Sequence, residues 1–450
     1  MGVAVGSTND GAIGRGFREA QNQRRAGGIR STLKSKSRCV LAPGLALTIG
    51  ASVLALDTGP ASAAAASSSP GVTANSITVG SISDISAPIA GLFEGGKVGT
   101  QAYFAMVNSE GGVNGRKLLL NGMDSAFSSG TVANDAKNIA ANDFAFVGGF
   151  SLLDGAEQPA IDTGHVPVVA QVLSPNLYTD PNLYSAMPLV TGGLSNGFFK
   201  WLKSKYPQDV KAVGVIGSNS AATAITAEHT FHNVTNNLGY NWVYERLATY
   251  TETSFLPDVI KMKNAGVKMF FEPAQQGAYI STMAQENKQE GLNALFVSGA
   301  NSYEAGFNPG SAGNGTLIGT DTALYMGQDA KVVPAVATFD KWAKKVDPQT
   351  QLDLYTLYGW ISAELFVQAL KGAGANPTRA SLDAQLNTIT SYNADGLITP
   401  QDPAKKIPGQ CWIVAEYENG TWKRIPPDPK AGFVCNPGGF YPSSYKGISR

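Results

Sequence analysis

The chain has 450 residues, 43% of them apolar, and its 34 basic and 34 acidic side chains balance at neutral pH. This length and apolar content predict a globular protein with more than one packed lobe and exclude a disordered chain. Eight of the basic residues precede position 64, so the remainder is mildly acidic and poorly suited to binding nucleic acid.

Residues 1–63 have the organisation of a secretory signal peptide. A long basic front precedes an uncharged apolar stretch at residues 39–56, and Ala61 and Ala63 form a small-residue cleavage signal behind it. Retention of the stretch as a membrane anchor is the less favoured alternative. We therefore expect an exported, extracytoplasmic protein at the cell surface, in the periplasm or secreted. Residues 64–75 are expected to be a flexible linker.

From residue 77 the chain alternates between strand-like and helix-like segments. The strand at residues 77–81 is followed by an apolar stripe at helical spacing between residues 98 and 106. Gly111-Gly112 is expected to end that helix, and Asn114-Gly115 to turn the chain. The three leucines at 118–120 then predict a strand that is buried on both faces of a parallel sheet.

The alternation continues in two successive series. The first includes a helix near residues 132–140, and the second begins near residue 192 and includes the strand-like stretch "VKMFFE". Such an order predicts an α/β protein with two doubly wound parallel-sheet lobes, whose ligand loops follow the carboxyl ends of strands. A long helix at residues 352–370 is expected to bury its aromatic residues, Tyr355, Tyr358, Trp360 and Phe366.

Two cysteines, Cys411 and Cys435, remain after the predicted leader. An even number in an oxidising compartment predicts a single disulfide bond. Strand-like residues on both sides of Asn419-Gly420 indicate a hairpin, which this disulfide would staple across its far end.

Several stretches taken together carry a resemblance to a known family: "ITVGSISDISAPIAG", "FAMVNSEGGVNGRKLLL", "FVGGFS", "QPAIDTGHVPVVA" and "FLPDVIKMKNAGVKMFFE". In this order, from about residue 77 to residue 419, the chain resembles the branched-chain amino-acid (Leu/Ile/Val) type of extracytoplasmic solute-binding protein that feeds ABC importers.

The resemblance implies a type I periplasmic binding protein fold, in which two lobes joined by a hinge close like a Venus flytrap on a small solute. Lobe 1 would comprise residues 76–190 and 323–395, and lobe 2 residues 191–322 and 396–450 with the disulfide-stapled hairpin. The implied partners are a small solute and the ABC permease and ATPase subunits. We expect a monomer with no cofactor, no metal and no catalytic residue.

The resemblance also implies the ligand-binding residues, and it departs from the family at one of them. Ser151 and the N–H groups of its loop would bind the solute carboxylate, which Asp154 would repel if it faced the cleft. The glutamate that pairs with the solute ammonium falls near Ala300 or Asn301, so we expect an amide, an aromatic acid or another amino-acid-like solute instead of an ordinary amino acid. One wall would contain Phe93, Ser151, Asp154, Gln171, Leu173 and Ser174, and the other Asn219, Ser220, Gln275, Gln276 and Asn301.

Three motifs suggest other functions. Residues 91–98 match the spacing of a phosphate-binding loop but lack its hydroxyl residue, so we expect a loop that needs close backbone approach to its ligand. His229 and His232 are expected on a solvated helix face, not in a metal site. Ser195 stands in a Gly-x-Ser-x-Gly motif, yet it is expected to cap and open a helix. A ligand-sensing ectodomain and, less favoured, an exported hydrolase remain as alternatives.

Overall fold

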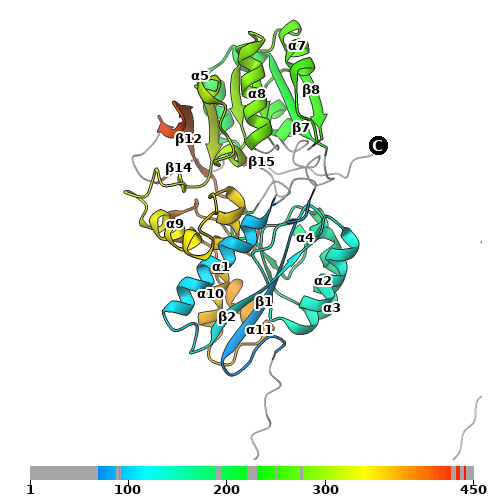
Figure 1. Cartoon of the computed structure of the whole chain (residues 1–450), viewed down its shortest axis with the longest axis vertical. Helices are drawn as coiled ribbons and strands as arrows, with labels where there is room; N and C mark the ends of the chain where they lie inside the picture. The colour runs from blue at the N-terminus through cyan, green and yellow to red at the C-terminus, as the bar shows by residue number, and fades with distance from the viewer. Residues whose placement is uncertain are drawn as a thin grey trace, which may run out of the picture. The chain divides into compact units, whose positions relative to one another are not determined.

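The computed structural model describes residues 69–87, 91, 93–188, 194–219, 231–249, 251–273, 277–426, 432–435 and 440–441. Residues 64–450 form one compact unit (Figure 1). The predicted signal peptide lies outside the described residues. None of the helices in the described ranges combines the length and the apolar character that crossing a membrane requires.

The first sheet contains five parallel strands in the order β2-β1-β3-β4-β5. Their bounds are β1 (Ser76–Ser83), β2 (Lys117–Asp124), β3 (Phe146–Val147), β4 (Val168–Val169) and β5 (Leu183–Tyr184). The helical elements that follow these strands are α1 (Glu94–Ser109), α2 (Ser129–Asn142), η1 (Asp154–Glu157), α3 (Gln158–Gly164) and α4 (Pro175–Tyr178). Later in the chain come α9 (Pro334–Val346), α10 (Leu354–Gly372), α11 (Arg379–Leu386) and η6 (Ala394–Gly396).

Helices cover both faces of this first sheet. Figure 1 shows α1 and α10 on one side of β1 and β2, and α2 and α3 on the other. Successive strand residues therefore enter different apolar clusters, because side chains alternate across a strand. Val147 and Val169 pack with α1 and α10, whereas Phe146 and Val168 pack with α2 and α3.

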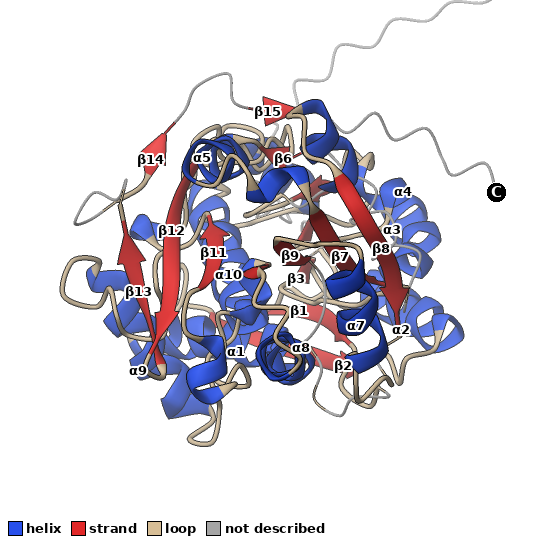
Figure 2. Cartoon of the chain, turned by 90° about the horizontal axis from the view of Figure 1, so that it is seen from above, coloured by secondary structure: helices blue, strands red, loops and turns tan. Residues whose placement is uncertain are grey.

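The second sheet is mixed and has the order β13-β12-β11-β10-β9-β7-β8, with β14 pairing β12 (Figure 2). Strands β7 (Val213–Ser218), β8 (Trp242–Ala248), β9 (Met269–Glu272), β10 (Leu295–Ser298) and β11 (Thr316–Thr320) are parallel. Strands β12 (Cys411–Glu418), β13 (Thr421–Ile425) and β14 (Val434–Cys435) add antiparallel pairs. The associated helical elements are α5 (Gly197–Lys205), η3 (Asp209–Lys211), α7 (Leu256–Asn264), α8 (Gly277–Gln289), η4 (Ala300–Ser302) and η5 (Gly310–Gly313).

These two sheets confirm the predicted α/β class. The first contains only strands between residues 76 and 184, and the second only strands between residues 213 and 435. The lobe limits given above stay a prediction.

The glycine-rich corner between α1 and β2 forms as expected. Gly111 and Gly112 adopt positive φ angles of 106° and 79° after the helix ends at Ser109. Asn108 fixes the corner, since its side chain donates to Leu118 O and accepts from Leu118 N, each at 2.8 Å. The prediction of a strand buried on both faces is wrong at Leu119, which is 47% exposed, because β2 is an edge strand covered at this residue on one face alone.

Two glycines of the segment 91–98 pack against the protein itself, since a Cβ on Gly95 would lie 2.7 Å from Thr356 N and one on Gly96 2.8 Å from Gly148 O. The expected approach of this segment to a ligand stays a prediction. A Cβ on Gly99 would lie 1.9 Å from Thr356 O, and one on Gly359 would lie 2.0 Å from Gly96 O. The Gly-rich start of α1 therefore brings the backbones of α1 and α10 into contact. Tyr358, Trp360 and Phe366 of α10 are buried and Tyr355 is partly buried, as predicted.

The C-terminal part confirms both the hairpin and the disulfide. Strands β12 and β13 pair around Asn419, which has a positive φ of 52°, and Gly420. The bond between Cys411 and Cys435 joins β12 to β14, so it ties a third strand to the hairpin. A further short pair links β6 (Leu194–Ser195) to β15 (Phe440–Tyr441).

Candidate ligand-binding site

The loops after β1, β3 and β4 lie together at one edge of the first sheet. These strands are parallel neighbours, so their carboxyl ends meet there. An isolated bridge between Ser83 and Phe150 continues the pairing past the end of β3. The loop residues predicted as one wall of the site, Ser151, Asp154, Gln171, Leu173 and Ser174, follow β3 and β4 here.

Asp84, which the sequence reasoning missed, collects the donors of the loop after β3. The Ser151 hydroxyl donates to its Oδ1 at 2.7 Å, and the Leu152 N–H donates to its Oδ2 at 2.8 Å. The Ser125 hydroxyl also donates to Oδ1. Asp84 is fully buried, so this carboxylate acts as an internal anchor for two loops.

Asp154 performs the same task for the loop after β4. It accepts from Leu173 N at 2.6 Å, from Ser174 N at 3.2 Å and from the Ser174 hydroxyl. Burial raises the pKa of Asp154 to about 6, against the opposing effect of these hydrogen bonds. Asp154 therefore holds the adjacent loop in place.

A consequence of both anchors is that four donors of this wall are already paired. The Ser151 hydroxyl and the N–H groups of Leu152, Leu173 and Ser174 are groups that could bind a carboxylate from solution. Here they bind the side chains of Asp84 and Asp154. A solute carboxylate at these positions would have to displace a buried carboxylate of the protein.

A small, partly open pocket of about 10 Å³ lies beside these anchors, which is about the room one water molecule needs. The amide of Gln171 is used internally, since it donates to Met187 O and accepts from the Ser185 hydroxyl. Glu157, another residue that the sequence reasoning missed, stands in the pocket wall. The lining residues are Ser81, Ile82, Phe146, Gly149, Ser151, Asp154, Glu157, Ala170, Gln171 and Val172.

Phe93 is placed beneath the loops. It is 1% exposed, and its ring meets Phe150 and Tyr355 edge-on at centroid distances of 4.7 and 4.5 Å. This aromatic cluster fixes the start of α1 against the loop after β3 and the first turn of α10. Its contribution to the site is therefore support for Phe150 and its loop.

The second sheet also places polar residues at its strand ends. Asn219 follows β7, is exposed, and donates its N–H to Ala248 O at 3.0 Å. Asn301 is half-buried in η4, after β10. The other predicted residues of this wall, Ser220, Gln275 and Gln276, lie outside the described residues.

A buried glutamate, Glu272, and a half-buried one, Glu304, could have been noticed from their positions after strand-like residues. Glu272 ends β9 and accepts from the Ser298 hydroxyl at 3.2 Å. Glu304 accepts from Gly277 N at 2.6 Å, and burial together with the charge of Asp353 raises its pKa to about 7. Glu304 thus lies three residues after Asn301, one of the two positions where the resemblance implies that the ammonium-binding glutamate is missing.

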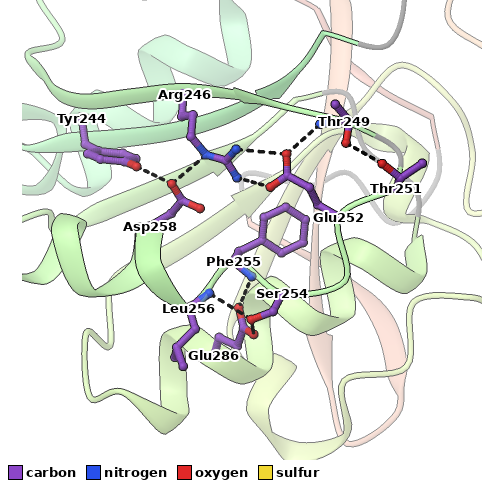
Figure 3. A network of polar contacts seen from close by, with 10 residues as sticks. All are labelled: Tyr244, Arg246, Thr249, Thr251, Glu252, Ser254, Phe255, Leu256, Asp258 and Glu286. Carbon is purple, nitrogen blue, oxygen red and sulfur yellow. Dashed lines mark hydrogen bonds and ion pairs between the residues drawn. The ribbon is translucent and has the colours of Figure 1, made fainter. Parts of the chain in front are cut away.

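An arginine network supports the loop after β8 (Figure 3). Arg246 donates from Nη1 and Nη2 to Glu252 at 3.0 and 2.5 Å, and its Nε lies 2.7 Å from Asp258 Oδ1. Glu252 also accepts from Thr249 N at 3.0 Å, and Tyr244 donates its hydroxyl to Asp258. The network ties the loop to the first turn of α7.

Next to this network, Glu286 of α8 fixes the other end of the same loop (Figure 3). It accepts from the Ser254 hydroxyl at 2.6 Å and from Phe255 N at 2.7 Å. The strand-end loop between β8 and α7 is therefore held by carboxylates at both ends.

Ser195 of the Gly-x-Ser-x-Gly motif and His232 lie outside the strand-end loops described above. Ser195 lies in β6, and Asn196 is the N-cap of α5 without a side-chain bond, so the expectation that Ser195 caps this helix is wrong. Within the described part of the chain, the Ser195 hydroxyl contacts no base. His232 stacks on Trp242 at a centroid distance of 3.8 Å, and His229 lies outside the described residues.

Comparisons with known proteins identify the family of this chain. A family model for periplasmic binding proteins matches residues 76–421. The Leu/Ile/Val-binding protein homolog 1 of Brucella suis is 26% identical over 341 residues, which cover 72% of this chain and 85% of that relative.

Solved structures show the same fold at lower identity. A fatty acid ABC transporter substrate-binding protein from Thermomonospora curvata has a TM-score of 0.67 at 19% identity, covering 82% of this chain and 95% of the other. A solute-binding protein of an R. palustris ABC transporter, in complex with 4-hydroxybenzoate, has a TM-score of 0.65 at 18% identity, covering 78% and 96%. Since the family model spans well over half of its length, this chain belongs to the periplasmic binding protein family.

Proposed function

We propose that this protein is the extracytoplasmic solute receptor of an ABC importer. It binds a small organic solute at strand-end loops and delivers it, chemically unchanged, to a permease driven by ATPase subunits. The family match over residues 76–421 carries the proposal. The signal-peptide pattern before residue 64 supports export, and a single copy of the chain is sufficient for the binding step.

The arrangement of donors bears on the class of solute. The relatives named above carry names that refer to Leu, Ile and Val, to a fatty acid and to 4-hydroxybenzoate, all of which have a carboxylate. In this chain Asp84 and Asp154 already occupy four donors of the first-sheet loops. The solute is therefore expected to present a different group to that wall.

A thermal-shift screen tests the receptor function. The purified mature protein is heated with amino acids, amides, amines and small aromatic acids, and a true solute raises the melting temperature because it binds the folded form alone. The bound compound is then recovered and analysed by mass spectrometry. We expect it unchanged; conversion to a product, or no stabilisation by any compound class, would count against a receptor.

A further inference from the structure

Glu157 is a buried acid without a partner among the residues that the structure describes. It is 7% exposed and ends η1, immediately before α3. Throughout the described part of the chain, no donor or cation contacts its carboxyl group. Burying a carboxylate without a partner is costly, so burial, followed by the charges of Asp154 and Asp84, raises its pKa well above the usual range.

The neighbouring acids, Asp84 and Asp154, differ from Glu157 because both have hydrogen-bond partners. Asp84 and Asp154 each accept hydrogen bonds from loop hydroxyl and N–H groups, whereas Glu157 faces the pocket together with the apolar side chains of Ile82, Phe146 and Val172. Among the described residues, no hydrogen bond to the Glu157 carboxyl group accounts for a glutamate at this position. A leucine or methionine would fill the same space without a buried charge.

The size of the pocket and the polar atoms in its wall determine which chemical group can bind there. Its volume of about 10 Å³ admits one group of the size of a water molecule. The acceptors available there are the carboxyl groups of Asp154 and Glu157 and the Ser81 hydroxyl, which has no hydrogen-bond partner among the described residues, while the nearby donors of Ser151, Leu173 and Ser174 are already engaged. A carboxylate would be repelled, and a hydroxyl would bring no charge. An ammonium group is of the right size and supplies three donors and a positive charge.

We propose that Glu157 binds a primary ammonium group of the solute in this pocket. The inference rests on the receptor function proposed above and narrows it to an amine-bearing solute. The ammonium is then held at the loops of the first sheet, whereas the family resemblance placed its partner glutamate after β10 in the second.

Matched compounds on one carbon skeleton test the proposal. The series 3-methylbutylamine, 3-methylbutan-1-ol and 3-methylbutanoate, and the series benzylamine, benzyl alcohol and benzoate, are titrated into the mature protein by calorimetry. Ammonium, sodium and potassium chlorides at equal ionic strength are separate arms. The variant Glu157→Gln is compared with Glu110→Gln, a control at an exposed glutamate at the end of α1.

We expect each amine to bind more tightly than its alcohol, and the carboxylates not to bind. Glu157→Gln should weaken the amines by at least about tenfold, the size of effect that one charge-assisted hydrogen bond produces. Its melting temperature without ligand should equal or exceed that of the parent, which shows that the variant folds. Glu110→Gln should bind the amines as the parent does.

The opposite results are distinguishable. A carboxylate or alcohol that binds at least as tightly as its amine, unchanged in Glu157→Gln, would overturn the ammonium site and leave the receptor function standing. Binding of sodium or potassium alone would also overturn it in favour of a cation site. Failure of every organic compound in these series and in the wider screen would count against both proposals.

Discussion

Replacement of Arg246 by methionine tests whether the network after β8 holds the strand-end loop. The substitution keeps an unbranched apolar stem but removes the guanidinium, which contacts Glu252 through two nitrogens and Asp258 through the third (Figure 3). Asp258 is the more exacting partner, because its side chain is only 6% exposed and would keep just the Tyr244 hydroxyl as a donor.

The expected cost follows from these contacts. Breaking a fully buried ion pair costs about 3–5 kcal/mol, and an exposed pair contributes at most about 1 kcal/mol. Arg246 is 30% exposed, so we expect a loss of roughly 3 kcal/mol. At about 2.1 cal/mol/K of unfolding entropy per residue, and about 390 residues after the leader, this loss lowers the melting temperature by about 4 °C.

A double-mutant cycle with Asp258→Asn isolates the ion pair. If the two residues act together, the double variant is little less stable than Arg246→Met alone. Lys344→Met is the control, because Lys344 is 57% exposed in its pair with Asp340 and should cost at most about 0.5 kcal/mol. The reasoning fails if Arg246→Met melts within one degree of this control, or if the costs in the cycle simply add.

Two further predictions concern pH and backbone packing. Burial raises the pKa of Glu304 to about 7 and of Glu364 to about 8, so the folded state holds protons that the unfolded chain releases near its ordinary pKa of 4.5. Their stabilising contribution is complete below pH 4.5 and is lost as pH rises through 7 and 8, at up to about 1.4 kcal/mol per pH unit for each group. Glu364→Gln should flatten this decline in melts between pH 5 and 9, and an unchanged profile would refute it. Gly99→Ala, whose Cβ would meet Thr356 O at 1.9 Å, should destabilise the protein by about 1–3 kcal/mol. The control Gly130→Ala on α2, whose Cβ would make only an ordinary contact with Ser128 Oγ at 3.7 Å, should gain about 0.5–1 kcal/mol in denaturant unfolding, and equal effects would contradict the packing argument.

The corner between α1 and β2 could be predicted because its residues form a local pattern that few conformations satisfy. Left-handed glycines and an Asn-Gly turn are common where a helix returns into a strand, and the corner from Asn108 to Leu118 contains them. Leu119 shows the limit of such signals. Three consecutive leucines look the same in a central strand and at an edge, because strand order depends on pairings between residues far apart in the sequence.

The glycines at the start of α1 show a second limit. The spacing of the glycines indicates that another group packs closely against this backbone, but it does not identify that group. In the structure the approaching group is the backbone of α10, some 260 residues later in the chain, and no sequence window contains both.

The candidate site depends even more on contacts between distant residues. Ser151 was placed correctly in the loop after β3, yet its function depends on whether its hydroxyl is free, and Asp84, 67 residues earlier, decides this. Likewise, the sequence leaves open whether Asp154 faces a cleft, because its hydrogen-bond partners lie in the next loop. Residue type and position can predict which loops meet, whereas the group a loop can bind depends on which donors remain unpaired after folding.

In the receptor function proposed above, this distinction separates the residues that hold the scaffold from those that bind the solute. An internal carboxylate that pairs with the loop N–H groups uses donors that could otherwise bind an anion, and it ties the loops together. Among the described residues, Glu157 is a pocket-lining acid without a hydrogen-bond partner, and burial raises its pKa well above the ordinary range. In the proposal made above, a solute ammonium favours the ionised form of Glu157, which a neutral or anionic group does not, and this difference is the source of selectivity.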